Sequence, residues 1–272
     1  MKTEIKRRTV IKTPAPAQTF ENEISRFMRF MVRTIRQRFE NMVIDELPDH
    51  RFQDSRGNYA RQFERLTRQV RQSIVRQFGD DRIEQLTHEI LHRTNKRNRR
   101  IFYKEIEEKI GIDTDRIVKQ EGLTWENNAL VAETMQWIKS LRDSTLEDHA
   151  TFALRAMATG ASRTAVVQEA VAVAANTGRR SAETAARTQI QTYNSLSTRL
   201  RALNLGIERA RWITSRDGKR VRRSHRDRDG KLFNLRKGLY SALDRKTLLP
   251  GVDYNCRCTY ELVLDRGDVL EW

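Results

Sequence analysis

The amino-acid sequence predicts a predominantly helical α+β fold, in which N-terminal and central helices precede a small C-terminal α+β module of short antiparallel strands. Only 4 prolines and 12 glycines occur among 272 residues, which favours long helices over many short strands. Apolar residues recur at helical spacing through most of the chain up to Leu205. After Gly206 this period gives way to short runs separated by Asp-Gly pairs, which are turn signals between strands.

The net charge of the chain indicates which classes of partner it binds. The chain carries 52 basic and 36 acidic residues, a formal net charge of +16. Such an excess predicts salt-sensitive association with nucleic acid or with an acidic protein surface. No run of about 18 apolar residues is present and the first residues lack the apolar core of a secretory signal, so we expect no membrane partner and synthesis in a reducing cytoplasm.

The N-terminal region is predicted to hold an arm and a set of helices. Residues 1–18 are basic, contain two prolines and show no sustained period, so we expect a flexible arm. Residues 19–124 are expected to form a helical docking region, because their apolar stripes can pack against a partner as well as against each other. The helical patterns cover residues 20–43, which Pro48 follows, residues 63–78, which Gly79 follows, and residues 83–100.

Arginines dominate the polar faces of the second and third of these helices. Residues 51–104 contain 14 basic and 6 acidic side chains, so they supply half of the net charge. Two interpretations stay open: a solvated helical surface, or a face that contacts DNA phosphates without reading bases. The candidate contact residues for nucleic acid or a partner are Arg61, Arg65, Arg68, Arg71, Arg97, Arg99 and Arg100.

Residues 125–272 are expected to form a second domain, with long helices to about residue 205 and a strand module over 207–264. A helix begins near Trp125, and Ser144 with Glu147 has the pattern of a capping box that opens the next one. Gly160 and Gly178 separate alanine-rich segments from a long helix over 181–205. Within that last helix, helix-surface hydrogen bonds are expected of Arg187, Tyr193 and Asn194.

Short strands are predicted in the C-terminal module. Turns are expected at Asp217-Gly218 and Asp229-Gly230, and residues 256–264 alternate so that Cys256, Cys258 and Tyr260 share one face. The predicted strands cover residues 211–215, 219–222, 231–234 and 256–264.

The two cysteines of the chain, Cys256 and Cys258, are the main candidates for site chemistry. Two cysteines one residue apart in an extended segment point to the same side, close enough to share a partner. With His225 they would supply three of the four ligands that tetrahedral zinc prefers. The alternative is that both cysteines are small core residues, since cysteine is often buried without any ligand.

An ordered series of residues resembles the Mu F-like head morphogenesis family of tailed bacteriophages, which includes SPP1-type minor head proteins. The resemblance runs over roughly residues 125–264. In many members a cysteine stands near the position of His225 and a histidine precedes the final Cys-Arg-Cys, where this chain has Asp253 and Tyr254. The matched metal candidates are therefore His225, Cys256 and Cys258. The other residues that carry the resemblance are Arg187, Asn194, Trp212, Asp217, Arg222, Gly230, Pro250, Gly251 and Arg257.

The resemblance implies a minor head protein of the virion rather than an enzyme. Its implied partners are the portal protein, other head proteins and packaged double-stranded DNA, which it would contact non-specifically after synthesis in the host cytoplasm.

Two alternatives from other classes stay open. One is a nuclease or group-transfer enzyme, in which His225 acts as a base beside Asp217, Asp227 or Asp229. Arg222 and Arg257 would then hold the phosphate. The other is a plain non-specific DNA-binding protein that uses the arginine face.

Overall fold

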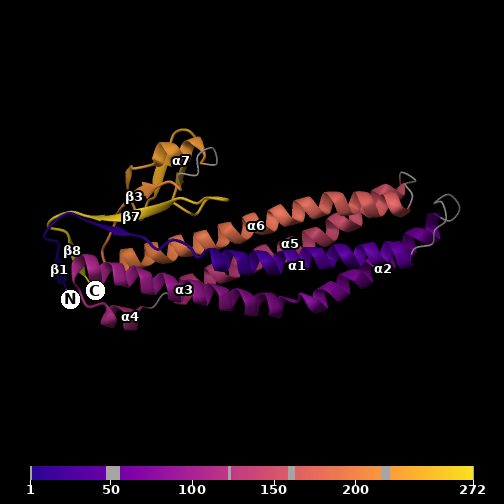
Figure 1. Cartoon of the computed structure of the whole chain (residues 1–272), viewed down its shortest axis with the longest axis horizontal. Helices are drawn as coiled ribbons and strands as arrows, with labels where there is room; N and C mark the ends of the chain where they lie inside the picture. Colours follow the sequence, from indigo (N-terminus) through magenta and orange to yellow (C-terminus); the bar gives the residue numbers. More distant parts are fainter. Residues whose placement is uncertain (1, 47–55, 122–123, 159–162, 216–220, 272) are drawn as a thin grey trace. The chain divides into compact units, whose positions relative to one another are not determined.

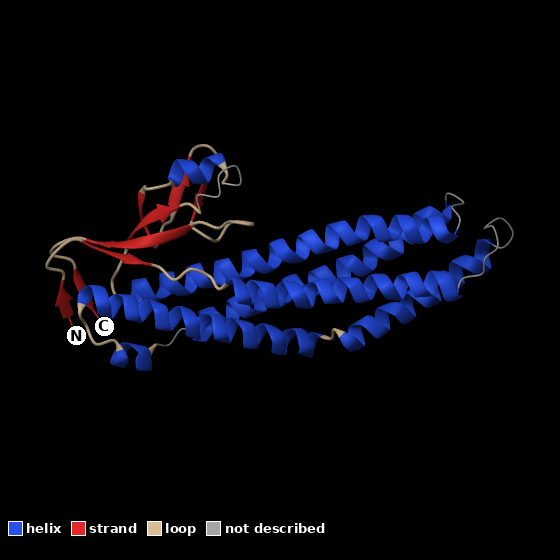
Figure 2. Cartoon of the chain, in the orientation of Figure 1, coloured by secondary structure: helices blue, strands red, loops and turns tan. Residues whose placement is uncertain are grey.

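A computed structural model describes residues 2–46, 56–121, 124–158, 163–215 and 221–271 of the chain. It is an α+β fold made mostly of helices, as the sequence predicts, with short antiparallel strands near both termini (Figures 1 and 2). The helices are α1 (Gln18–Asn41), the π-helix η1 (Met42–Glu46), α2 (Arg56–Gln77), α3 (Asp80–Ile110), α4 (Asp115–Gln120), α5 (Thr124–Ala158), α6 (Arg163–Asn204) and α7 (Arg223–Arg228).

The first three predicted helices are confirmed. In α1, Ile24, Met31, Ile35 and Phe39 follow the helical period and are all buried. Helix α2 ends at Gln77, just before Gly79, and α3 extends the predicted 83–100 pattern at both ends. The spacing of apolar residues therefore sets these helices and the faces that they bury.

Two expected helix boundaries are wrong. Helix α5 runs through Ser144 without a break, because the hydroxyls of Ser144 and Thr145 donate to the carbonyl of Leu141 in the preceding turn instead of capping a new helix. Helix α6 runs through Gly178, where alanine-rich neighbours with high helix propensity offset the cost of one glycine, about 1 kcal/mol. Gly160 lies outside the described residues.

The strands form one four-stranded antiparallel sheet, one hairpin and one terminal pair. The sheet has the order β2-β7-β3-β4, the hairpin pairs β5 with β6, and β1 pairs with β8. The strands are β1 (Lys2–Glu4), β2 (Thr9–Lys12), β3 (Arg209–Ile213), β4 (Leu232–Asn234), β5 (Leu239–Ser241), β6 (Lys246–Leu248), β7 (Thr259–Leu264) and β8 (Val269–Glu271).

The prediction of a flexible arm over residues 1–18 is wrong. Strand β2 pairs with β7 in register Ile11↔Leu262, and Ile5 and Ile11 are buried in the core. The β-branched residues of β2 suit an edge strand, but their partner lies some 250 residues away in the sequence, so no local pattern marks it.

The predicted strands of the C-terminal module are partly confirmed. Strands β3 and β4 cover most of the predicted segments, and the last strand starts later than expected, at Thr259. Its predicted buried face is confirmed, since Cys256, Cys258, Tyr260, Leu262 and Leu264 are all buried, but Val263 is buried too, so the alternation ends at Leu262.

The return strand expected over 219–222 is not observed where the chain is described. Arg222 is instead the N-cap residue of α7. Asp217-Gly218, where a turn was expected, lies outside the described residues.

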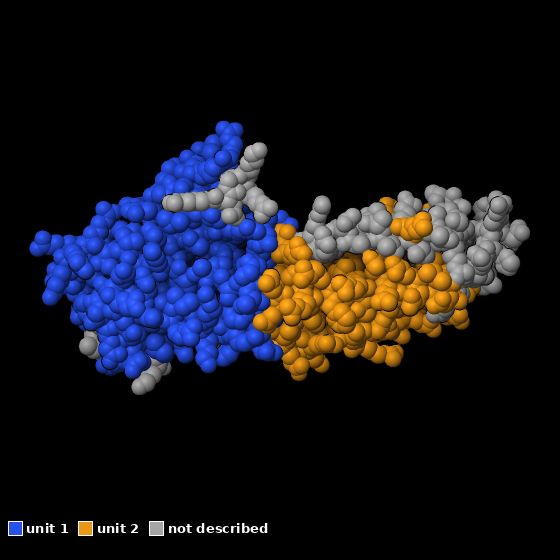
Figure 3. All heavy atoms as spheres, in the orientation of Figure 1, with its two compact units in different colours: residues 1–21, 89–131, 187–272 blue, residues 22–88, 132–186 orange. Residues whose placement is uncertain are grey.

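The chain divides into two compact units, each built from separate stretches (Figure 3). This differs from the linear boundary expected at residue 125, because α1, α3, α5 and α6 each contribute residues to both units. Unit 1 comprises residues 1–21, 89–131 and 187–272, and unit 2 comprises residues 22–88 and 132–186.

Each unit has its own core. In unit 1 the rings of Trp212, Phe233 and Tyr260 pack edge to face on one side of the sheet. In unit 2 the ring of Phe78 contacts Phe27 and Phe30 in the same manner. Over the described residues, none of the helices combines the length and apolar character that a bilayer span requires.

His149 is a titratable group buried in the core of unit 2. Its ring stacks on Phe39 with centroids 5.4 Å apart, and its Nε2 atom has no hydrogen-bond partner among the described residues. Burial, together with the nearby Arg36 charge, lowers the pKa of His149 to about 4. The folded protein therefore keeps this imidazole neutral at pH values where the unfolded chain binds a proton.

We expect the free energy of unfolding to fall by about 2 kcal/mol between pH 7 and pH 5 through His149 alone, because only the unfolded state gains a proton there. Denaturant unfolding at both pH values, in the wild type and in His149→Phe, measures this contribution. The variant should lose that part of the pH dependence. His88→Phe, which changes an exposed histidine, is the control, and an equal pH dependence in wild type and His149→Phe would contradict the assignment.

Candidate metal centre

One face of α6 holds the segment that carries both cysteines. We call residues 250–258 the cysteine loop, and the four side chains that hold it the anchor face. These side chains lie at positions i, i+3, i+4 and i+7 of the helix, so they point the same way, and all are buried. The anchor face consists of Thr188, Gln191, Thr192 and Ser195.

The anchor face makes hydrogen bonds to the backbone of the cysteine loop at four places. At its two ends, Ser195 Oγ donates to the carbonyl of Pro250 at 2.5 Å and Gln191 Nε2 donates to the carbonyl of Cys258 at 2.9 Å. Between them, the hydroxyl of Thr192 donates to Gly251 at 3.4 Å, and the amide of Asn255 donates to Thr188 Oγ1 at 2.9 Å. These bonds satisfy backbone groups that a buried irregular segment cannot pair by itself.

Gly251 fits this close approach because it lacks a side chain. Its φ angle is +83°, and a Cβ atom there would lie 2.9 Å from Nε2 of Gln191. Both the backbone conformation and the space therefore require glycine at this position.

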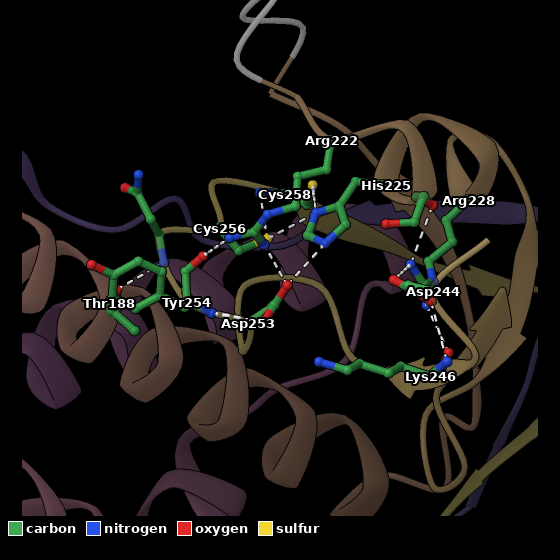
Figure 4. Close-up of polar contacts among 12 residues, drawn as sticks. Thr188, Arg222, His225, Arg228, Asp244, Lys246, Asp253, Tyr254, Cys256 and Cys258 are labelled. Atoms are coloured by element: carbon green, nitrogen blue, oxygen red, sulfur yellow. Dashed lines mark hydrogen bonds and ion pairs between the residues drawn. The ribbon is translucent and has the colours of Figure 1, made fainter.

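The cysteine loop and α7 bring His225, Cys256 and Cys258 together, as the sequence predicts (Figure 4). His225 Nδ1 lies 3.5 Å from the sulfur of Cys256 and 3.5 Å from the sulfur of Cys258. All three side chains are buried, and the Trp212 ring meets the imidazole edge to face at 5.7 Å. The arrangement directs one nitrogen and two sulfurs toward a common point.

Asp253 orients the histidine from its other side. Its Oδ2 atom lies 3.2 Å from His225 Nε2, and the same carboxylate is paired with Arg222. Arg222 also donates to the carbonyl of Tyr254 at 2.6 Å, which ties α7 to the cysteine loop. With Nε2 occupied by Asp253, Nδ1 is the nitrogen that faces the thiols.

The two thiols titrate as a pair. The hydrogen bond from Cys258, aided by His225, lowers the pKa of Cys256 to about 5 although burial opposes this shift. The same hydrogen bond and burial raise the pKa of Cys258 far above the usual range. The pair therefore favours ionisation of Cys256 over that of Cys258.

Arg228 fixes α7 in place and was not identified from the sequence. Its guanidinium is fully buried and forms two bonds to Asp244, at 2.9 and 3.0 Å, and donates to the carbonyls of Leu239 and Lys246 (Figure 4). The hydrogen bonds from Arg228 hold the pKa of Asp244 well below its usual range. In the sequence Arg228 is one of many arginines, so nothing distinguishes it as a buried anchor.

Other residues of the resemblance take structural places in unit 1. Arg187 donates to Asn255 Oδ1 at 3.0 Å and so contacts the cysteine loop. Asn194 is buried rather than on the helix surface, and it donates to the carbonyl of Pro14 at 2.6 Å while it accepts from Asn98. Gly230 has a φ angle of +74° in the turn before β4, and Asp217 lies outside the described residues.

The arginines predicted to contact nucleic acid or a partner lie in two different units. Arg61, Arg65, Arg68 and Arg71 belong to unit 2, whereas Arg97, Arg99 and Arg100 belong to unit 1. Several have protein partners: Arg71 pairs with Glu147 at 3.3 Å, and Arg97 donates to the carbonyl of Ala15 at 2.7 Å. Arg61, Arg65 and Arg68 are exposed on α2, and Arg68 pairs with Glu64 at 3.8 Å.

The aspartates considered for a nuclease have other contacts. Asp227 accepts from Lys231 at 2.9 Å and from Ser241 at 3.1 Å. Asp229 accepts from the amide of Thr214 at 2.8 Å, which closes the turn before β4. The carboxylate beside His225 is Asp253, which was noted in the sequence only for its position.

The region that carries the cysteine–histidine cluster is similar to a family of phage proteins. Residues 144–261 match the family described as "Phage Mu protein F like protein". The matched region includes all of α6 and α7, the cysteine loop and the first half of β7.

Comparison with known proteins adds one relative without an assigned role. The chain is 32% identical over 159 residues to a protein of Haemophilus influenzae named "Uncharacterized protein". The match covers 58% of this chain but spans only about a third, 34%, of that relative's length. No solved structure matches the chain.

Gly251→Ala should destabilise the protein more than Gly230→Ala. Both glycines have positive φ, so both variants carry the left-handed cost of about 1–2 kcal/mol, but only an alanine at 251 also displaces Gln191. Thermal unfolding of the two variants measures the difference, which we expect to exceed 1 kcal/mol. Equal destabilisation would show that the anchor face does not constrain the cysteine loop.

Proposed function

We propose that this protein is a minor head component of a tailed bacteriophage, and that it binds the portal and contacts packaged double-stranded DNA without sequence preference. The single observation that supports this proposal most is the match of residues 144–261 to the phage Mu protein F-like family. That family suggests head morphogenesis, a place in the virion and other head proteins as partners. The portal and the DNA are the specific partners that we add.

Exposed apolar side chains support α1, η1 and α2 as the docking part. Phe30, Ile44 and Val75 are 46%, 47% and 42% exposed, although each belongs to a helix whose other face is buried. These three residues lie outside the matched region and within unit 2. Apolar groups on a helix surface gain free energy when a partner covers them.

The charge of the chain supports contact with DNA. A net charge of +16 favours association with a polyanion. Arg61, Arg65 and Arg68 are exposed on α2, and flexible basic side chains of this kind contact phosphates without reading bases.

A non-enzymatic role is favoured over a nuclease by the contacts of the carboxylates. His225 pairs with Asp253, which is itself neutralised by Arg222, and Asp227 and Asp229 hold other parts of the module. A general base needs a partner that leaves it free to accept a proton from a bound water or hydroxyl.

Co-purification with a phage portal protein tests the proposal. We expect the wild-type chain to elute with assembled portal rings, and the double substitution Phe30→Ser, Val75→Ser to weaken the complex at least tenfold, since two buried apolar side chains would be lost. Leu154→Ser, which changes an equally exposed residue of α5, is the matched control. Failure of the wild type to bind portal rings would overturn the proposed partner, and equal loss in the control would overturn the docking surface.

A further inference from the structure

The distances within the cysteine–histidine cluster match those of a tetrahedral zinc site. Zinc lies about 2.3 Å from a thiolate sulfur and about 2.0–2.1 Å from an imidazole nitrogen. At the tetrahedral angle these bonds place nitrogen and sulfur about 3.6 Å apart. His225 Nδ1 lies 3.5 Å from each of the two sulfurs, so both nitrogen–sulfur distances match those of a zinc site, and the three ligand atoms all lie within 4.8 Å of one another.

The surroundings of the cluster are those that a metal-binding histidine requires. A ligating imidazole usually donates its second N–H to a carboxylate, which fixes the tautomer and the ring orientation. Asp253 is in this position at 3.2 Å from Nε2. The amide of Cys258 also points at the sulfur of Cys256 at 3.4 Å, a contact that stabilises a thiolate.

A fourth protein ligand is absent among the described residues within reach of the three. The metal-ligating cluster there consists of His225, Cys256 and Cys258 alone. All three residues line one pocket of about 430 Å³, which is open to a small molecule. A site with three protein ligands keeps one position for an external ligand.

The charges around this pocket favour an anion. Arg187, Arg222 and Arg257 line it together with the three ligand residues. Asp253 pairs with Arg222, and Glu21 lies near Arg187 and Arg257. Among the described residues, three guanidinium groups line the pocket itself, whereas neither carboxylate does, and two thiolates neutralise one Zn²⁺ ion.

We propose that His225, Cys256 and Cys258 bind one zinc ion, and that its fourth position opens into the arginine-lined pocket and takes an oxygen of a phosphate group. Zinc would link α7 to the cysteine loop and would supply a Lewis acid centre for the anion. This inference is independent of the proposed portal partner, because purified protein without other head proteins suffices to test it.

Zinc content tests the ligand set. Protein purified with reduced thiols and without chelators should contain about one zinc per chain, and Cys258→Ser should lose it. Asp253→Asn keeps all three ligands and should lower zinc affinity by 10- to 100-fold, as expected when the orienting carboxylate is removed. Asp227→Asn, which makes the same change on α7 away from His225, is the control and should bind as the wild type does.

Two outcomes of these measurements would contradict the proposal. Less than about a tenth of a zinc per chain, after exposure of the reduced protein to zinc, would overturn the site. Equal affinity of Asp253→Asn and the wild type would overturn the role of Asp253 as the orienting residue.

Cobalt substitution tests the fourth position, because the visible absorption of Co²⁺ reports its coordination. Inorganic phosphate should shift the absorption of the cobalt protein, and Arg257→Gln should raise the phosphate concentration needed by about tenfold, in line with the loss of one charge-assisted contact. Arg226→Gln, an exposed arginine of α7 outside the pocket, is the control.

A short DNA duplex in the same titration separates the two sources of phosphate. A shift with inorganic phosphate shows that a free phosphate suffices, and a shift with DNA alone assigns the backbone phosphate as the ligand. An unchanged spectrum with both probes would overturn the open position.

Discussion

The hydrogen bonds between the anchor face of α6 and the cysteine loop are the constraint on which the candidate site depends. The loop has almost no regular structure, so its buried backbone groups need partners from elsewhere. Thr188, Gln191, Thr192 and Ser195 provide them along one side of a long, rigid helix. Because each bond fixes a different point of the loop, both sulfurs are directed toward one position, where a ligand would find them preorganised.

The histidine is placed by a second set of contacts. Arg228 secures α7 to Asp244 and to backbone carbonyls of the β5–β6 hairpin, and Asp253 sets the ring orientation of His225. A buried guanidinium is costly unless its donors are satisfied, and here the carboxylate and the carbonyls satisfy them. Helix α7 and the cysteine loop thus meet so that His225 faces both sulfurs.

The sequence predicts the local features well and the long-range ones poorly. Apolar spacing sets α1, α2 and α3, and alternation from Cys256 to Leu264 correctly assigns a buried face. The site triad could be proposed because cysteine and histidine are rare in this chain. Contacts across the fold determine the pairing of β2 with β7 and the roles of Asp253 and Arg228. The residues involved are ordinary charged and β-branched residues, so the sequence alone does not indicate these contacts. The anchor face did leave a signal, a row of polar residues at helical spacing on a helix that is otherwise rich in small residues.

Hydrogen exchange of the Asn255 amide tests the central claim most directly. This N–H donates to Thr188 Oγ1, and it belongs to a loop that would exchange rapidly if α6 did not hold it. We expect slow exchange in the wild type and an increase of at least tenfold in Thr188→Val, with no change in Thr34→Val, whose hydroxyl bonds only within α1. Rapid exchange of Asn255 in the wild type would contradict the account.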